Sequence, residues 1–181
     1  IMPFVEARIP VANKVRMLLG ASMGGFSSMQ LFFKNSSIFK KVAIVCPLLP
    51  FPGISPLSED AERQAYAHTN PAVSYGFMGG FSLALSAMSD IAGTFGLPAN
   101  AQAPRWVQHD PVQLLKAVRN PRTLPALHID YNDQDDLNLN IAAEYLAGQL
   151  KLKGVPFTIN KSVGSHCEKR DNTKLFRFLD Q

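Results

Sequence analysis

The sequence is poor in cysteine and in charge, and each shortage excludes a class of protein. Its two cysteines, Cys46 and Cys167, are too few for a disulfide-stapled scaffold or a cysteine-built zinc site. Charged residues make up 18% of the 181 residues, and the formal net charge is +4. Adjacent basic residues occur as Lys40-Lys41 and Lys169-Arg170, which form no basic stripe, so we predict no nucleic-acid partner.

The sequence also lacks a hydrophobic run that could cross a membrane. The longest weakly polar stretch, residues 76–97, is interrupted by Asp90 and by several glycines and serines, and no positive charge flanks it. Ile1 is not followed by the basic n-region of a signal peptide, because Pro3 and Glu6 come at once. We therefore predict no membrane span, and these patterns leave the cellular compartment unknown.

Apolar material is sufficient for one ordinary domain over residues 1–181, since hydrophobic residues make up 46% of the chain. Short apolar runs alternate with stretches of helical periodicity. The predicted strands are residues 15–19, 41–46, 124–131 and 157–163, and the predicted helices are residues 23–34, 138–153 and 168–179. This alternation predicts an α/β fold with a mostly parallel sheet and helices on both faces.

A long insertion, residues 48–122, separates the second and third predicted strands and contains most of the proline and glycine. It is expected to form loops and short helices outside the sheet. It begins at the carboxyl end of a strand, and ligands bind at that edge of open α/β sheets. Most of its aromatic side chains are expected in the core, and Trp106 and Phe77 are the candidates for contact with a substrate.

Residues 20–25, Gly-Ala-Ser-Met-Gly-Gly, carry the most informative motif. They form a G-x-S-x-G pattern between an apolar strand and an amphipathic helix, which is the context of a nucleophile elbow. Ser22 is then the candidate nucleophile, and the backbone N–H of Met23 is the candidate oxyanion donor at the start of the helix. A phosphate loop is excluded because the Gly-Lys-Ser/Thr ending is missing. A glycine-rich turn with an N-capping serine remains the alternative.

A serine nucleophile needs a base, and His166 is the candidate. It follows the last predicted strand, on the sheet edge where Ser22 is expected. A histidine there can accept and return a proton near neutral pH. The other histidines have simpler interpretations. His68 and His109 lie in the insertion, and His128 lies inside an apolar strand, where packing or a hydrogen bond would explain it.

The acidic loop after the third predicted strand supplies the third member of a triad. Asp135 lies far enough past the strand to turn back toward His166, and Asp133 and Asp136 remain alternatives. The order serine, acid, histidine is that of the α/β-hydrolases. We expect Ser22 Oγ near His166 Nε2, and His166 Nδ1 near an Asp135 oxygen, each within about 3–4 Å. Asp136 could instead cap the following helix.

The two cysteines receive structural interpretations. Cys46 ends a predicted buried strand and is expected to be a small core residue. Cys167 adjoins His166, but no basic surroundings that would activate a thiol are visible, so no thiol chemistry is predicted.

Four motifs follow one another along the chain. Residues 20–25 match an elbow written Gly-x-Ser-Met-Gly-Gly, and Asp110-Pro111 precedes a short helix. Residues 132–135 match a Gly-x-x-Asp turn with Asn132 in place of the glycine, and residues 164–166 match a Gly-x-His ending. In these motifs the chain resembles serine esterases of the esterase-D, or enterochelin-esterase-like, branch of the α/β-hydrolases.

The resemblance implies a serine carboxylic ester hydrolase that uses a Ser-His-Asp triad and passes through an acyl-enzyme intermediate. It implies a small-molecule ester as substrate, and neither a metal nor an organic cofactor. An acyltransferase with the same triad stays open as an alternative. So does an inactive fragment or a non-catalytic scaffold, because a fold does not guarantee a function.

The resemblance also implies that this chain is the C-terminal portion of the family's domain. Family members carry further strands before the nucleophile strand, and a loop among them normally supplies the second oxyanion donor. The four predicted strands would then be neighbours in chain order, with residues 15–19 as an unpaired edge. Such edges recruit partners, so we expect self-association through this edge or another chain segment that covers it.

Overall fold

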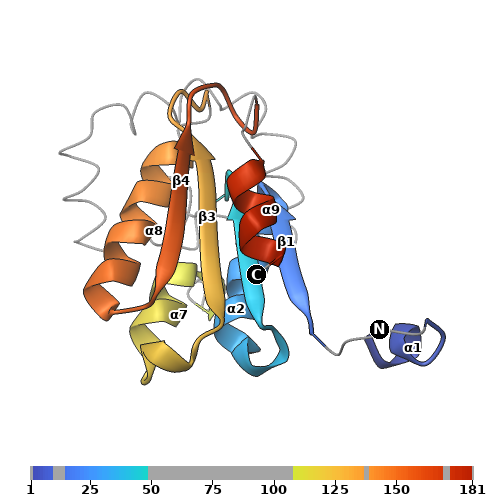
Figure 1. The fold of residues 1–181 in the computed structure, drawn as a ribbon. Helices are drawn as coiled ribbons and strands as arrows, with labels where there is room; N and C mark the ends of the chain where they lie inside the picture. Colours follow the sequence, from blue (N-terminus) through green and yellow to red (C-terminus); the bar gives the residue numbers. More distant parts are fainter. Residues whose placement is uncertain (1, 10–14, 49–107, 137–138, 169–171, 181) are drawn as a thin grey trace, which may run out of the picture.

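The four predicted strands form one parallel sheet in the computed structural model (Figure 1). The structure describes residues 2–9, 15–48, 108–136, 139–168 and 172–180. The strands are β1 (Met17–Ala21), β2 (Lys41–Val45), β3 (Ala126–Asn132) and β4 (Phe157–Ser162), in the order β1-β2-β3-β4. The predicted strand order and direction are confirmed, and the strand ends differ from the predicted ones by at most two residues.

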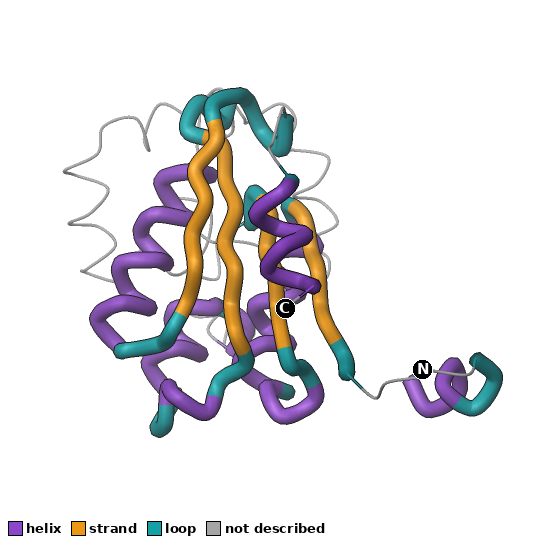
Figure 2. The backbone as a smooth tube through the Cα atoms, in the orientation of Figure 1, coloured by secondary structure: helices purple, strands orange, loops and turns teal. Residues whose placement is uncertain are grey.

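Helices lie on both faces of this sheet (Figure 1 and Figure 2). Three of them, α2 (Met23–Lys34), α7 (Pro111–Ala117) and α8 (Leu139–Lys153), pack on one face, and α9 (Thr173–Asp180) lies on the other. The described residues also include α1 (Met2–Glu6) and short 3-10 turns at Ser36–Ile38 and Pro121–Thr123. No helix in these described segments is both long and apolar enough to span a membrane.

The predicted helix 168–179 is wrong at its start, because α9 begins at Thr173. Glu168 belongs to a turn, in which its backbone N–H donates to the Ser165 carbonyl at 3.1 Å. Its own carbonyl accepts a hydrogen bond from the Asn132 side chain. These contacts hold residues 165–168 to the loops at the sheet edge. The other predicted helices agree with α2 and α8, apart from residue 138, which lies outside the described residues.

The alternation of side chains along β2 divides the core into two layers. Val42 and Ile44 belong to the larger cluster, with apolar side chains of α2, α7, α8 and β3. Ala43 and Val45 face the other way and pack with Leu175 of α9 in a smaller cluster. Burial on both faces explains why β2 is a continuous apolar run. Both layers hold the strand ends in place, and these ends carry the candidate site.

One buried cation fastens α9 to the sheet. Lys41, at the start of β2, is 8% exposed. Its Nζ donates to the carbonyls of Phe178 and Leu179, at 2.7 and 3.0 Å. The last carbonyls of a helix have no partner within the helix and carry its negative dipole end, so a lysine there is stabilising.

The predicted insertion, residues 48–122, falls mostly on residues 49–107, which lie outside the described part of the chain. Trp106 and Phe77, the candidate substrate contacts, lie there. The described end of the segment leads into α7. The Asp110 carboxylate caps this helix by accepting from the N–H groups of Val112 and Gln113, at 3.2 and 3.3 Å.

We expect the 181-residue chain to self-associate through β1. This strand pairs with β2 on one side, and no strand in the described segments pairs with its other edge. Met17 and Leu19 point from the same face of β1 and are 48% and 51% exposed. An unpaired strand edge with exposed apolar side chains favours pairing with another chain.

Light scattering on the purified chain checks this expectation. The measured molar mass should exceed that of one chain. The Leu19→Lys variant should associate less, because a lysine at a strand edge opposes pairing. A wild-type chain that remains monomeric at micromolar concentrations would contradict the prediction.

Candidate active site

Ser22 occupies a sharp turn between β1 and α2. Its backbone has φ 52° and ψ −118°, and positive φ is uncommon for a residue other than glycine. Two hydrogen bonds join this turn to the segment at the end of β2. The Ser22 N–H donates to the Val45 carbonyl at 2.9 Å, and the Ser22 carbonyl accepts from the Leu48 N–H at 2.9 Å. The turn lifts Ser22 out of the strand, and its geometry is that expected for the elbow.

Gly20 is the glycine that allows this turn to close. A Cβ atom at Gly20 would lie 2.1 Å from the Gly24 carbonyl oxygen and 2.2 Å from Ser28 Oγ. No side chain fits there without separating β1 from α2. A Cβ at Gly24 would meet nothing within 4 Å. The close approach therefore requires a glycine at position 20, whereas at position 24 only the backbone takes part in it.

His166 accepts or donates hydrogen bonds on both sides of its ring. Its Nε2 lies 3.1 Å from Ser22 Oγ, and its Nδ1 lies 2.8 Å from Asp135 Oδ2. The Asp135 carboxylate is fully buried, whereas the His166 side chain is 18% exposed. Both expected distances are therefore confirmed. The catalytic roles of the three side chains remain predictions.

The other two acidic candidates lie differently. Asp136 Oδ1 accepts a hydrogen bond from the backbone N–H of His166 at 3.0 Å, so this carboxylate supports the histidine loop rather than the ring. The capping role that the sequence left open for Asp136 involves residues 137–138, which lie outside the described residues, so it remains a prediction. Asp133 contributes backbone contacts, and its Oδ1 has no hydrogen-bond partner among the described residues.

Backbone hydrogen bonds connect the acid loop to the histidine loop beyond the ends of β3 and β4. The Asp133 N–H donates to the Ser162 carbonyl at 2.9 Å, and the Gln134 N–H donates to the Gly164 carbonyl at 3.1 Å. Gly164 has φ 143°, in the region that favours glycine. These hydrogen bonds hold the two loops together beyond the last paired residues of β3 and β4, and Asp135, which follows Gln134, reaches the ring.

Met23 is the first residue of α2. The N–H groups in the first turn of a helix have no partner within the helix, and the helix dipole favours negative charge beside them. The backbone N–H of Met23 is the first of these groups and directly follows Ser22, so it is the candidate donor to an oxyanion on a Ser22 adduct. Its role remains a prediction.

Two other histidines have contacts of their own. His128 is 3% exposed, its Nδ1 lies 2.8 Å from Thr158 Oγ1, and its ring stacks on Phe178. This agrees with the prediction of a packed and hydrogen-bonded side chain. His109 contacts Gln30 and lies 3.2 Å from Lys34 Nζ. Burial and the Lys34 ammonium group lower the pKa of His109. His68 lies outside the described residues.

A disulfide joins Cys46 and Cys167 beside the site, with their Cα atoms 5.6 Å apart. The sequence interpretation missed this bond, because it considered the number of cysteines and not their placement. Cys46 directly follows β2, and Cys167 directly follows His166. Residues that follow the carboxyl ends of parallel strands in one sheet share one edge, which was the available signal. Cys46 is 1% exposed, so its predicted burial is confirmed.

The disulfide also bears on metal binding. One ligand atom each of Cys46, Cys167 and His166 lies within 4.8 Å of the others, the only such group of three or more among the described residues. The two sulfurs are bonded to each other, and a metal ligand must be a thiolate. In the disulfide form this group therefore offers one imidazole and no thiolate.

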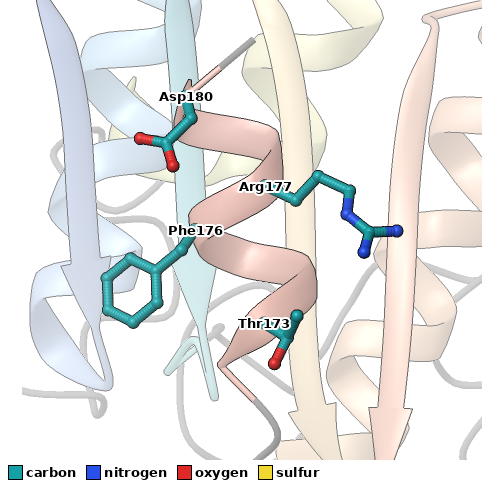
Figure 3. A pocket seen from close by; sticks show the side chains of 4 residues that line it. All are labelled: Thr173, Phe176, Arg177 and Asp180. Atoms are coloured by element: carbon teal, nitrogen blue, oxygen red, sulfur yellow. The ribbon is translucent and has the colours of Figure 1, made fainter.

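A surface hollow along α9 has no part in this constellation. It is lined by Thr173, Phe176, Arg177 and Asp180 (Figure 3). In the figure the four side chains point in different directions from a single helix. Ser22, Asp135 and His166 do not line the hollow, so we do not assign it to a substrate.

A comparison with protein families identifies the family of this chain. A family model described as "Putative esterase" matches residues 1–178, nearly the whole chain. The chain belongs to this esterase family. A search of curated proteins found no match.

Solved structures show the same fold as this esterase-family chain. S-formylglutathione hydrolase from Staphylococcus aureus matches with a TM-score of 0.57 and 19% identity, over 91% of this chain and 54% of that one. The enzyme of the same name from Agrobacterium tumefaciens matches with a TM-score of 0.55 and 17% identity, over 91% and 47%. Esterase B from Lactobacillus rhamnosis matches with a TM-score of 0.56 and 16% identity, over 92% and 52%.

These likenesses make the sheet and its helices part of an α/β-hydrolase fold, as predicted. The chain spans about half the length of the solved structures that it matches.

Proposed function

We propose that this chain carries the catalytic centre of a serine carboxylic ester hydrolase. The observation that supports the proposal best is the His166 ring, which lies 3.1 Å from Ser22 Oγ on one side and 2.8 Å from Asp135 on the other. A nucleophile within reach of a base, itself oriented by a third group, is the arrangement that activates serine. Membership of the esterase family agrees with this chemistry.

In the first half of the reaction, Ser22 Oγ attacks the carbonyl carbon of the ester. His166 Nε2 takes the hydroxyl proton as the new bond forms. The carbonyl oxygen becomes an oxyanion beside the start of α2, where the Met23 N–H stabilises it. When the tetrahedral intermediate collapses, His166 returns the proton to the departing alkoxide, and the acyl group remains on Ser22.

In the second half, a water molecule takes the place of the alcohol. His166 accepts a proton from the water, which attacks the acyl-enzyme and releases the carboxylic acid. Asp135 keeps one proton on His166 Nδ1, which leaves Nε2 free to accept. It also stabilises the imidazolium that forms in both halves. Full burial of the Asp135 carboxylate strengthens this electrostatic contribution.

The substrate class that we infer is a small carboxylic ester with an uncharged acyl or aryl group. The inference comes from the composition of residues 48–122, which are rich in apolar residues and start at the catalytic edge of the sheet. An apolar cleft favours apolar over charged groups. Two of the similar solved structures are S-formylglutathione hydrolases, so an anionic thioester is the alternative to compare.

We expect the full-length protein to hydrolyse p-nitrophenyl acetate and p-nitrophenyl butyrate, and to be inactivated by one equivalent of a fluorophosphonate. Release of p-nitrophenolate measures the first, and mass spectrometry of the labelled peptide should place the adduct on Ser22. A folded protein without hydrolysis, or an adduct on another residue, would overturn the proposal. Activity confined to anionic thioesters would overturn only the substrate class.

A further inference from the structure

Three residues with unusual backbone angles meet at the candidate site. In the described part of the chain, positive φ occurs outside glycine at Ser22, Cys46 and Cys167, with φ of 52°, 42° and 58°. Such conformations persist where the surroundings impose them, and they cluster at active sites. Ser22 is the proposed nucleophile, and the other two residues form the disulfide. The disulfide therefore belongs to the same strained constellation as the nucleophile.

On one side, the disulfide is anchored to a segment in fixed register with Ser22. Val45 accepts the hydrogen bond from the Ser22 N–H, and Leu48 donates to the Ser22 carbonyl, both at 2.9 Å. Cys46 lies between them, and its own N–H donates to the Asp130 carbonyl of β3 at 2.7 Å. Cys46 is also 1% exposed within the smaller core cluster. The Cys46 sulfur is thus a rigid reference point beside the nucleophile.

On the other side, the disulfide holds the residue next to the base. The hydrogen bonds described above tie the loop around His166 to the acid loop, through Gly164, Asp135 and Asp136. The disulfide joins the same loop to Cys46, in the segment that is hydrogen-bonded to Ser22. The Cys167 sulfur lies 3.7 Å from His166 Nε2, the nitrogen that faces Ser22.

We propose that the Cys46–Cys167 disulfide is a thiol-sensitive positioning element, which keeps His166 Nε2 within reach of Ser22 Oγ. The proposal rests on the esterase function proposed above. The disulfide contacts the proposed base, forms no bond with the substrate, and acts through the position of His166. Its effect appears in the chemical step, since a misplacement of about 1 Å can cost about 100-fold in rate.

A dithiol reductant removes this restraint by cleaving the disulfide. One of its thiolates attacks the sulfur of Cys167, which is half-buried, rather than that of the buried Cys46. The S–S bond breaks, and its electron pair leaves with the Cys46 sulfur, which takes a proton. The second thiolate of the reductant then attacks the mixed disulfide and releases the Cys167 thiol. The products are two cysteine thiols and the oxidised, cyclic reductant.

The first experiment compares the oxidised and the dithiothreitol-reduced full-length protein. Hydrolysis of p-nitrophenyl butyrate gives kcat and KM, and alkylation with mass spectrometry counts the free thiols. A chelator is present throughout, because two thiols beside His166 could bind a metal ion. We expect reduction to lower kcat about 10- to 100-fold, with KM changed less than about twofold. Reoxidation should restore kcat.

Near-UV circular dichroism on the same samples separates positioning from folding. If kcat falls while the spectrum is unchanged, the proposal is supported. If kcat stays within about twofold after both thiols appear, the proposal is overturned. If activity and spectrum are lost together, the disulfide is a structural staple and the proposal is also overturned.

Three variants provide the matched controls. Cys46→Ala, Cys167→Ala and the double variant should show the same loss of kcat, because either change removes the whole disulfide. None of them should respond further to dithiothreitol. A double variant with wild-type kcat would overturn the proposal. Absence of hydrolysis by the folded, oxidised wild-type protein would instead overturn the esterase function itself, so the two failures are distinguishable.

Discussion

Replacing Ser22 by alanine should reduce kcat for short-chain p-nitrophenyl esters by about 10⁵- to 10⁶-fold, to the level of background hydrolysis. Alanine leaves no atom to form the acyl-enzyme, and His166 then has no hydroxyl to activate. The fold should persist, because the hydrogen bonds that hold the turn use the Ser22 backbone, which alanine retains. Steady-state kinetics and circular dichroism measure the two outcomes together.

Ser27→Ala is the matched control for this variant. It makes the same chemical change five residues along, at an exposed position of α2, where the hydroxyl bonds only to the Met23 carbonyl in the described contacts. We expect activity within about twofold of the wild type. A folded Ser22→Ala protein that keeps a tenth of the wild-type activity would exclude Ser22 as the nucleophile.

The strands and the elbow could be predicted because each is encoded by neighbouring residues. β2 is an unbroken apolar run, since both of its faces are buried. The elbow is a short motif in which Gly20 must lack a side chain, because Gly24 and Ser28 leave no room for one. Local patterns of this kind require no knowledge of distant parts of the chain.

Three features depended on contacts between distant residues, and the sequence pattern left them open or missed them. The disulfide joins cysteines 121 positions apart, which only the strand order brings together. Glu168 does not begin a helix, and Asn132, from the end of β3, holds its carbonyl instead. Lys41 is buried at the start of an apolar strand because the last carbonyls of α9 lie within reach of its ammonium group.

The choice among the acids is a fourth case of this kind. Asp133, Asp135 and Asp136 are almost adjacent, so the pattern around them does not distinguish them. The hydrogen bonds from the Asp133 N–H to the Ser162 carbonyl and from the Gln134 N–H to the Gly164 carbonyl fix the acid loop beside the histidine loop. A shift of the loop by one residue would bring Gln134 or Asp136 to His166 in place of Asp135.

Asp135→Asn should therefore have the second-largest effect, a fall in kcat of about 10⁴-fold with KM little changed. The asparagine amide can donate to His166 Nδ1, which places the ring proton on Nε2. A ring protonated at Nε2 cannot accept the Ser22 proton. The Asp135→Asn substitution also removes the buried negative charge that stabilises the imidazolium. Kinetics with p-nitrophenyl butyrate, at equal folded fraction, measure the effect.

The neighbouring acids test whether position or charge alone is responsible. Asp133→Asn should retain activity within about twofold, since no carboxylate contact of Asp133 reaches the ring in the described contacts. Asp136→Asn keeps an amide oxygen that can accept from the His166 N–H, so we expect a loss below about tenfold. All three substitutions remove one negative charge from the same loop. An equal loss in all of them would indicate a general electrostatic effect, whereas a loss concentrated at Asp135 requires the direct contact with His166.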